Sequence, residues 1–139
     1  MESNSISLKD VWAKTDPFQS IVTHSILSGL IAQVIWNQMP EGAQEELAQF
    51  LSCTQEQGKA WLGYLVSLHD IGKVEELFQW QWPEMRARIE QAGKKPEFAD
   101  TKVRHERTTV EALNERIWKE LGAEKSLRSF YAGVLGAHH

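Results

Sequence analysis

Residues 65–73 read LVSLHDIGK, an apolar helical segment that ends on a histidine, an aspartate and a glycine. The helix is predicted to begin at the capping box of residues 54–57 (TQEQ) and to end near Gly72. A carboxylate at Asp70 is unfavourable there, because the helix macrodipole is negative at its C-terminal end. Leu68 and Ile71 on either side indicate burial, and an unpaired buried carboxylate costs on the order of several kcal/mol. A metal cation beside Asp70 would offset both penalties.

Two interpretations of this segment remain open. In the first, Asp70 forms an ion pair with Lys73, and His69 is a polar side chain with hydrogen-bond partners of its own. In the second, His69 and Asp70 both bind metal. Adjacent residues on a regular helix face different directions, but at a fraying helix end before Gly72 both side chains can turn toward one centre.

Helical periodicity runs through most of the chain, whereas strand signals are scarce. A long helix is predicted from Asp16-Pro17, with Asp as N-cap and Pro at the first helical position, to the break at residues 40–42. Its apolar residues recur at three- and four-residue spacing: Phe18, Ile21, Val22, Ile26, Leu30, Ile31, Val34 and Ile35. Further helices are predicted around 47–51, 74–82, 105–120 and 124–137, with a loop at 92–101. The predicted fold class is all-α.

Composition bounds the class of protein. The 139 residues fit one domain, 42% are hydrophobic and 24% are charged, as in a soluble globular protein. A single cysteine, Cys53, excludes a disulfide framework and favours a cytoplasmic location. We find no signal peptide, and no apolar run of about 18 residues that would predict a membrane span.

Charge bears on the choice of partner. The formal net charge of −4 argues against a freestanding, high-affinity nucleic-acid binder. Residues 86–107 nevertheless hold seven basic side chains against four acidic ones. This segment is interpreted either as a solvated loop or as a rim that attracts phosphate.

The five histidines are the most informative residues: His24, His69, His105, His138 and His139. Taken singly, each has an ordinary explanation: a core histidine bonded to backbone for His24, a surface residue for His105, and the stub of a purification tag for the terminal pair. Together with Asp70 they fit a cluster of nitrogen and oxygen ligands. Such a cluster suits Mn, Fe, Co, Ni or Zn and disfavours Ca. Six ligands are too many for one tetrahedral zinc and nearly enough for two metals, which suit in-line displacement at phosphorus.

The order of these motifs resembles a known family. A helix-one histidine in PFQSIVTHSILSG is followed by KAWLGYLVSLHDIGK with a trailing LFQ, then by RHE and by GAHH. This order is similar to that of the HD nuclease domain in type I CRISPR-associated helicase-nucleases (the Cas-three family), which degrade DNA at targets marked by the Cascade complex. The resemblance covers residues 10–139 and implies an HD-domain helical bundle. The bare HD pair is weak evidence, but HDIGK with a downstream histidine and a final HH is specific.

The resemblance implies roles for particular residues. His24, His69 and Asp70 would hold one divalent transition metal, and Asp70 would bridge to a second metal held by His105, His138 and His139. Lys73 would lie near the scissile phosphate, so Asp70 and Lys73 are the expected catalytic residues.

The resemblance also implies an activity and partners. Mn, Co, Ni or Fe are the expected metals, with Zn as a further option. The expected activity is metal-dependent cleavage of single-stranded DNA in prokaryotic antiviral defence, with helicase domains and the Cascade complex as partners.

One departure from the family pattern is evident. Family members continue beyond the position of His139, and their last metal-ligating aspartate lies in that continuation. We therefore expect residues 1–139 to be the N-terminal portion of a single HD-type nuclease domain that lacks its C-terminal part. The fragment alone is then expected to be inactive or weakly active. Two other functions stay open: an HD phosphohydrolase acting on nucleotides or cyclic dinucleotides, and a non-catalytic binding module with structural histidines.

Overall fold

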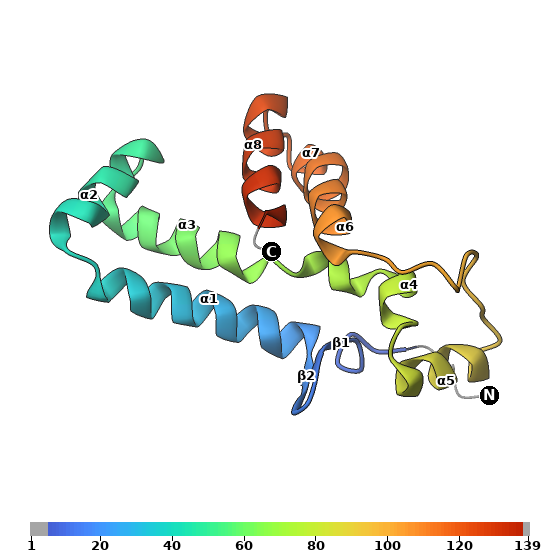
Figure 1. Ribbon diagram of the computed structural model, residues 1–139. Helices are drawn as coiled ribbons and strands as arrows, with labels where there is room; N and C mark the ends of the chain where they lie inside the picture. Colours follow the sequence, from blue (N-terminus) through green and yellow to red (C-terminus); the bar gives the residue numbers. More distant parts are fainter. Residues whose placement is uncertain (1–5, 138–139) are drawn as a thin grey trace.

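The computed structural model describes residues 6–137, which form helices around a short N-terminal hairpin (Figure 1). The elements in chain order are β1 (Trp12–Thr15), β2 (Phe18–Ser20), α1 (Ile21–Gln38), α2 (Glu41–Phe50), α3 (Gln55–Ser67), the 3₁₀ helix η1 (Ile71–Val74), α4 (Glu76–Gln79), α5 (Pro83–Gln91), α6 (His105–Glu111), the π-helical segment η2 (Ala112–Ile117), α7 (Trp118–Glu120) and α8 (Lys125–Gly136). The predicted all-α class is confirmed, with the hairpin as a small addition.

The predicted start of the first helix is wrong. Asp16-Pro17 forms the turn of the antiparallel β1–β2 hairpin, with a cis peptide bond, and α1 begins at Ile21. Ser20 is the N-cap, and its hydroxyl oxygen accepts a hydrogen bond from the Thr23 amide at 3.2 Å. Proline suits a tight turn as well as the first position of a helix. The dipeptide alone therefore does not distinguish the two structures.

Helices α1 and α3 lie side by side (Figure 1), and glycine sets how closely they approach. A Cβ atom added to Gly29 would lie 2.8 Å from the carbonyl oxygen of Gly63. The buried face of α1 consists of Ile21, Gly29, Ala32 and Trp36. The helix thus packs through small residues and one indole, which explains the short separation.

Most of the apolar stripe on α1 is exposed in the described structure. The exposed large residues of this helix are Val22, Ile26, Leu27, Leu30, Ile31, Val34 and Ile35. Apolar periodicity therefore identified the helix, but the face that packs on α3 carries mainly other residues. Within the described residues, no helix has the length and apolar character needed to cross a membrane.

Most of the buried apolar residues of the described chain fall into three separate clusters. The first joins Leu113, Trp118, Ala132 and Leu135, between α6–α7 and α8. The second holds Trp80, Met85 and Ile89, and the third consists of Val11, Ala13 and Ile21 at the base of the hairpin.

Residues 92–104 form a connection without helix or strand that leads the chain back to α6. Helix α6 packs against η1, and Gly72 makes this contact possible. A Cβ atom added to Gly72 would lie only 2.2 Å from the His105 carbonyl oxygen and 2.4 Å from the Thr109 amide nitrogen. The glycine of the HDIGK motif therefore brings His105 next to the histidine–aspartate pair.

Candidate metal centre

Asp70 lies in the turn between α3 and η1 and is only 3% exposed. The helix ends one turn earlier than the apolar pattern suggests, so that His69 and Asp70 leave the regular helix. The Thr109 hydroxyl fixes this turn from α6. It donates a hydrogen bond to the His69 carbonyl oxygen at 3.2 Å and accepts one from the Gly72 amide at 3.0 Å. The turn lets adjacent side chains face one centre, which a regular helix would not allow.

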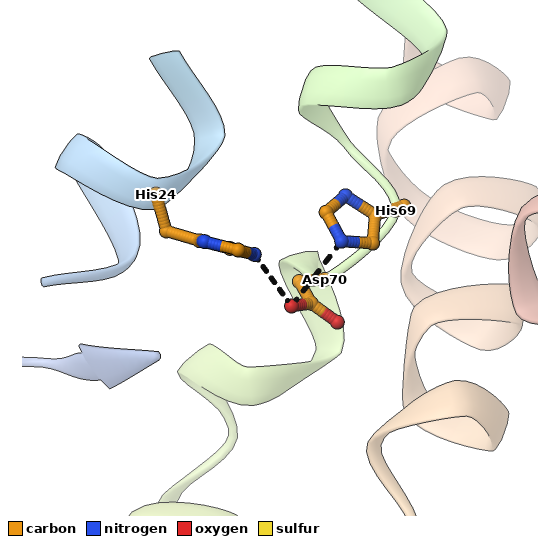
Figure 2. Close-up of side chains that lie close together, drawn as sticks. All are labelled: His24, His69 and Asp70. Atoms are coloured by element: carbon orange, nitrogen blue, oxygen red, sulfur yellow. Dashed lines mark ion pairs between the residues drawn. The ribbon is translucent and has the colours of Figure 1, made fainter. Parts of the chain in front are cut away.

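Four cationic or imidazole groups surround the Asp70 carboxylate. Oδ2 lies 2.9 Å from Nε2 of His24, 3.3 Å from Nε2 of His69 and 2.7 Å from Nζ of Lys73. Oδ1 lies 3.0 Å from Nε2 of His105. Figure 2 shows His24 reaching across from α1 and His69 approaching from the α3 end, both toward the same carboxylate oxygen. The two oxygens of Asp70 therefore face two different sets of partners.

The structure brings together four of the six residues that the sequence analysis grouped: His24, His69, Asp70 and His105. One ligand atom each from His24, His69 and Asp70 all lie within 4.8 Å of one another. His105 is buried and approaches the other side of the same carboxylate. The interpretation of His105 as a surface residue is wrong, because the connection before α6 folds it inward. His138 and His139 lie outside the described residues.

The imidazole rings of His24 and His69 are oriented by their Nδ1 atoms. Nδ1 of His69 lies 2.7 Å from the Val66 carbonyl oxygen, and Nδ1 of His24 lies 3.0 Å from Oε1 of Gln19. The Val66 carbonyl oxygen only accepts, so Nδ1 of His69 carries a proton and donates it; with Oε1 of Gln19 facing His24, Nδ1 of His24 is the donor there too. Each Nε2 then points at Asp70. Imidazoles that bind metal through Nε2 commonly donate Nδ1–H to a carbonyl in this way.

Electrostatics keep Asp70 ionised. Burial raises the pKa of the Asp70 carboxyl, but hydrogen bonds from His69 and Lys73 outweigh burial and hold that pKa well below its ordinary value. The hydrogen bond with Asp70 raises the pKa of His69, which favours its charged form. Desolvation lowers the pKa of His24 despite the neighbouring carboxylate, which favours its neutral form.

His24 provides the clearest test of whether a cation fits. Its Nδ1 proton is directed at Gln19, and the lowered pKa disfavours a second proton on Nε2. Nε2 is buried and forms no regular hydrogen bond within residues 6–137, although Oδ2 of Asp70 is 2.9 Å away. A neutral ring would therefore direct a lone pair at a carboxylate oxygen. A divalent cation shared between these two atoms would resolve that conflict, so the residues fit a metal.

A cavity borders η1. It has a volume of about 1060 Å³ and is lined by Gly72, α4 and the start of α6. Its basic side chains are Lys102, Arg104, Arg107 and Arg116, and its acidic ones are Glu75, Glu76, Glu106 and Glu111. Because the charges balance, this cavity gives no particular support to the interpretation of the basic segment as a phosphate rim.

Sequence reasoning missed the residues that orient the site. Gln19, Thr109 and Gln79 form hydrogen bonds with His24, the HD turn and Lys73, respectively, and those of Thr109 join segments far apart in the sequence. Gln19 stands in PFQSIVTHSILSG and Gln79 in the LFQ that follows HDIGK, and these motifs are the local signals for the two glutamines. A glutamine or threonine has many uses, and its partner cannot be read from the sequence.

Comparison with known proteins identifies the family. The model of the family described as "Cas3, HD domain" matches residues 12–139, nearly the whole chain. The chain belongs to the Cas3 HD domain family. This Cas3 HD domain is also 32% identical, over 131 residues, to the CRISPR-associated endonuclease/helicase Cas3 of Thermus thermophilus. That match covers 93% of the chain but only 14% of the relative.

A solved structure supports the fold of the Cas3 HD domain. A crystal structure of a CRISPR-associated protein superimposes with a TM-score of 0.82 at 22% sequence identity. The superposition covers 99% of this chain and 16% of the other. At this identity the likeness establishes the helical fold, and the chemistry has to be argued from the site.

Proposed function

We propose that this Cas3 HD domain is a metal-dependent nuclease that hydrolyses the phosphodiester bonds of single-stranded DNA in CRISPR antiviral defence. The observation that carries the proposal is the buried Asp70 carboxylate, with His24, His69 and Lys73 around one oxygen and His105 at the other. Burying a carboxylate costs free energy, and a purely structural module would not need a buried carboxylate that faces the Nε2 atoms of several imidazoles. Membership of the family supports the same conclusion.

Two divalent transition metals are proposed, with Asp70 as the shared ligand. His24 and His69 would complete the first position, and His105, His138 and His139 the second. Nitrogen and carboxylate ligands suit Mn, Co, Ni or Fe, and Zn also accepts them. When bound, such metals lower the pKa of water and stabilise negative charge at a reacting phosphate.

Lys73 has a role of its own in this proposal. Its ammonium group lies 2.7 Å from Asp70 Oδ2 and donates a hydrogen bond to the Ala13 carbonyl oxygen at 3.3 Å. The side chain is 13% exposed, so it stands at the border between the buried carboxylate and solvent. A fixed cation there would hold a phosphate oxygen of the DNA and stabilise the charge that develops during hydrolysis.

The partners follow from the size of the relative and the charge of this chain. The Thermus relative is both an endonuclease and a helicase, and the chain spans 14% of its length. We propose that residues 1–139 are the N-terminal portion of such a nuclease domain and that helicase domains feed it DNA marked by a Cascade complex. A net charge of −4 predicts weak affinity of this portion for DNA, and delivery by a motor would compensate for it.

Replacement of Asp70 by alanine tests the function. In the full-length protein, including its proposed helicase domains, we expect Asp70→Ala to abolish Mn-dependent cleavage of single-stranded DNA, because both proposed metal positions share this carboxylate. Hydrolysis of ATP by the attached motor should be unchanged. Glu46→Ala, which removes an exposed carboxylate on α2, is the matched control and should retain cleavage.

Two results would contradict the proposal. Cleavage by Asp70→Ala near the wild-type rate would show that Asp70 is not a ligand. A wild-type protein that hydrolyses nucleotides or cyclic dinucleotides but leaves single-stranded DNA intact would place it with the HD phosphohydrolases instead.

A further inference from the structure

Gln79 is a polar residue with a buried side chain, and it reaches the candidate centre through the backbone of Lys73. It closes α4, is 3% exposed, and both ends of its amide are engaged. Oε1 accepts a hydrogen bond from the Trp12 amide at 2.9 Å. Nε2 donates to the Trp12 carbonyl oxygen at 2.9 Å and to the Lys73 carbonyl oxygen at 2.6 Å. Both amide hydrogens are therefore used, each on a backbone acceptor.

These bonds join two segments that both touch Lys73. Gln79 holds the backbone of Lys73 in η1 and the backbone of Trp12 in β1. Ala13, the residue after Trp12, accepts the hydrogen bond from the Lys73 ammonium group at 3.3 Å. Gln79 therefore holds the backbone of Lys73 directly. Through Trp12 it also holds Ala13, whose carbonyl oxygen accepts the hydrogen bond from the Lys73 ammonium group.

Trp12 strengthens the same connection. Its indole Nε1 donates to the Gln79 carbonyl oxygen at 3.3 Å, and its ring stacks on Phe78 with 4.7 Å between ring centroids. The ammonium group of Lys73 lies 6.0 Å from the centroid of the same Phe78 ring. Through Trp12, the hairpin thus packs against Phe78 and Gln79, next to the side chain of Lys73.

We propose that Gln79 is a positioning residue for DNA cleavage, which holds Lys73 and its Ala13 acceptor so that the ammonium group stays directed at Asp70. This inference rests on the proposed nuclease function and extends it to a residue outside the metal centre. Without the amide hydrogens, the Lys73 carbonyl oxygen and Trp12 lose their common partner, and the lysine gains freedom at both ends. The effect on catalysis then passes through Lys73 and through no other group.

A double-mutant cycle in the full-length protein tests whether Gln79 affects cleavage through Lys73. Gln79→Met keeps the volume of the side chain and removes its hydrogen bonds, and Lys73→Ala removes the group that it positions. We expect Gln79→Met to lower kcat on single-stranded DNA by roughly 10-fold to 100-fold. In the Lys73→Ala background the same change should alter kcat by no more than about twofold, because coupled residues are not additive. Gln81→Met, which removes one hydrogen bond to Val103, is the control and should leave kcat unchanged.

A second measurement is independent of activity. Lys73 is held at both ends, so its amine should react slowly with an acetylating reagent, as quantified by mass spectrometry against the exposed Lys125. Gln79→Met should raise the labelling of Lys73 at least about threefold relative to Lys125. Where Gln79→Met does not fold, Gln79→Glu replaces it. The glutamate keeps the acceptor for the Trp12 amide but cannot donate to Lys73.

The outcomes separate this inference from the proposed function. An equal loss of kcat with and without Lys73, or unchanged Lys73 labelling in a folded variant, would assign Gln79 a merely structural role and overturn the inference. Failure of both variants to fold would do the same. Wild-type protein without DNA cleavage would instead sink the nuclease proposal, while Lys73 labelling would still report whether Gln79 positions the lysine.

Discussion

At the scale of single residues, Gly72 shows how a motif residue with no chemistry of its own controls the site. Its missing side chain leaves room for the first turn of α6, which brings His105 to Oδ1 of Asp70. Thr109 from the same helix then closes hydrogen bonds on both sides of the turn. A side chain at position 72 would separate η1 from α6 and so divide the centre.

We therefore expect Gly72→Ala to lower the free energy of unfolding by about 3 kcal/mol, the upper end of the cost of overpacking, because its Cβ would meet backbone atoms. Gly42→Ala in α2 is the control, since a Cβ there meets nothing within 4 Å. It should be neutral or stabilising by up to about 1 kcal/mol. Urea unfolding of both variants measures the difference. Equal stability of the two would mean that η1 and α6 do not pack as closely as described.

The histidines and the aspartate that gather in the candidate centre stand out in the sequence, but the residues that hold them in place do not. His69 and Asp70 stand out because a charge at the end of an apolar helix conflicts with local physics. His105 was ambiguous, since its burial depends on how residues 92–104 fold back. Gln19 and Thr109 carry no local conflict at all. Their importance arises from partners 5 and 37–40 residues away, which only the folded chain reveals.

At the scale of elements, the pairing of α1 with α3 sets the distance across the centre. His24 stands on α1 and the HD turn follows α3, so the contact between Gly29 and Gly63 controls both. The two glycines are not equivalent. A Cβ on Gly29 would meet the Gly63 carbonyl oxygen at 2.8 Å, whereas a Cβ on Gly63 would meet side-chain atoms of Gln33, Nε2 at 2.7 Å and Cγ at 2.9 Å.

This difference makes a matched pair of variants. Gly29→Ala should destabilise the protein by about 1–3 kcal/mol, because a backbone atom cannot move aside without separating the helices. Gly63→Ala should cost less than about 1 kcal/mol, because the flexible Gln33 side chain can rotate away. Binding of Mn²⁺ should weaken only in Gly29→Ala, where His24 moves away from Asp70. Thermal unfolding and calorimetric titration test this, and a larger cost for Gly63→Ala would reverse the argument.

Helices were the elements that the sequence predicted best. The capping box at Thr54 and Gln57 is present, and the segments 105–120 and 124–137 are helical nearly throughout. The hairpin was missed because two strands this short leave no alternating pattern. The sequence did not reveal the buried face of α1, because the exposed apolar residues of this helix give a stronger periodic signal than Gly29 and Ala32.

At the scale of the whole molecule, the centre depends on elements that lie far apart in the chain. His24, the HD pair and His105 come from three stretches of chain that meet only when α1, η1 and α6 are in place. The unfolded chain offers no such arrangement of ligands. A metal that binds this centre must therefore stabilise the folded protein as a unit.

We expect Mn²⁺ to raise the midpoint of thermal unfolding, with a stabilisation of about 2.7 kcal/mol when free metal reaches roughly one hundred times its Kd. A chelator should reverse the shift. Asp70→Asn, which keeps the shape of the side chain but not its charge, should abolish the shift, whereas Glu46→Ala should retain it. An undiminished shift in Asp70→Asn would show that the metal binds elsewhere.

The irregular connection at residues 92–104 divides the centre unequally between the two parts of the chain. Everything before it carries His24, His69, Asp70 and Lys73, and the part after it contributes His105 through the packing of α6 on η1. A single proteolytic nick in this connection would therefore leave two complementary fragments. Neither fragment would contain the whole centre. Mixing the two would restore it only if α6 packs again on η1 at Gly72, where the absence of a side chain leaves room for the helix.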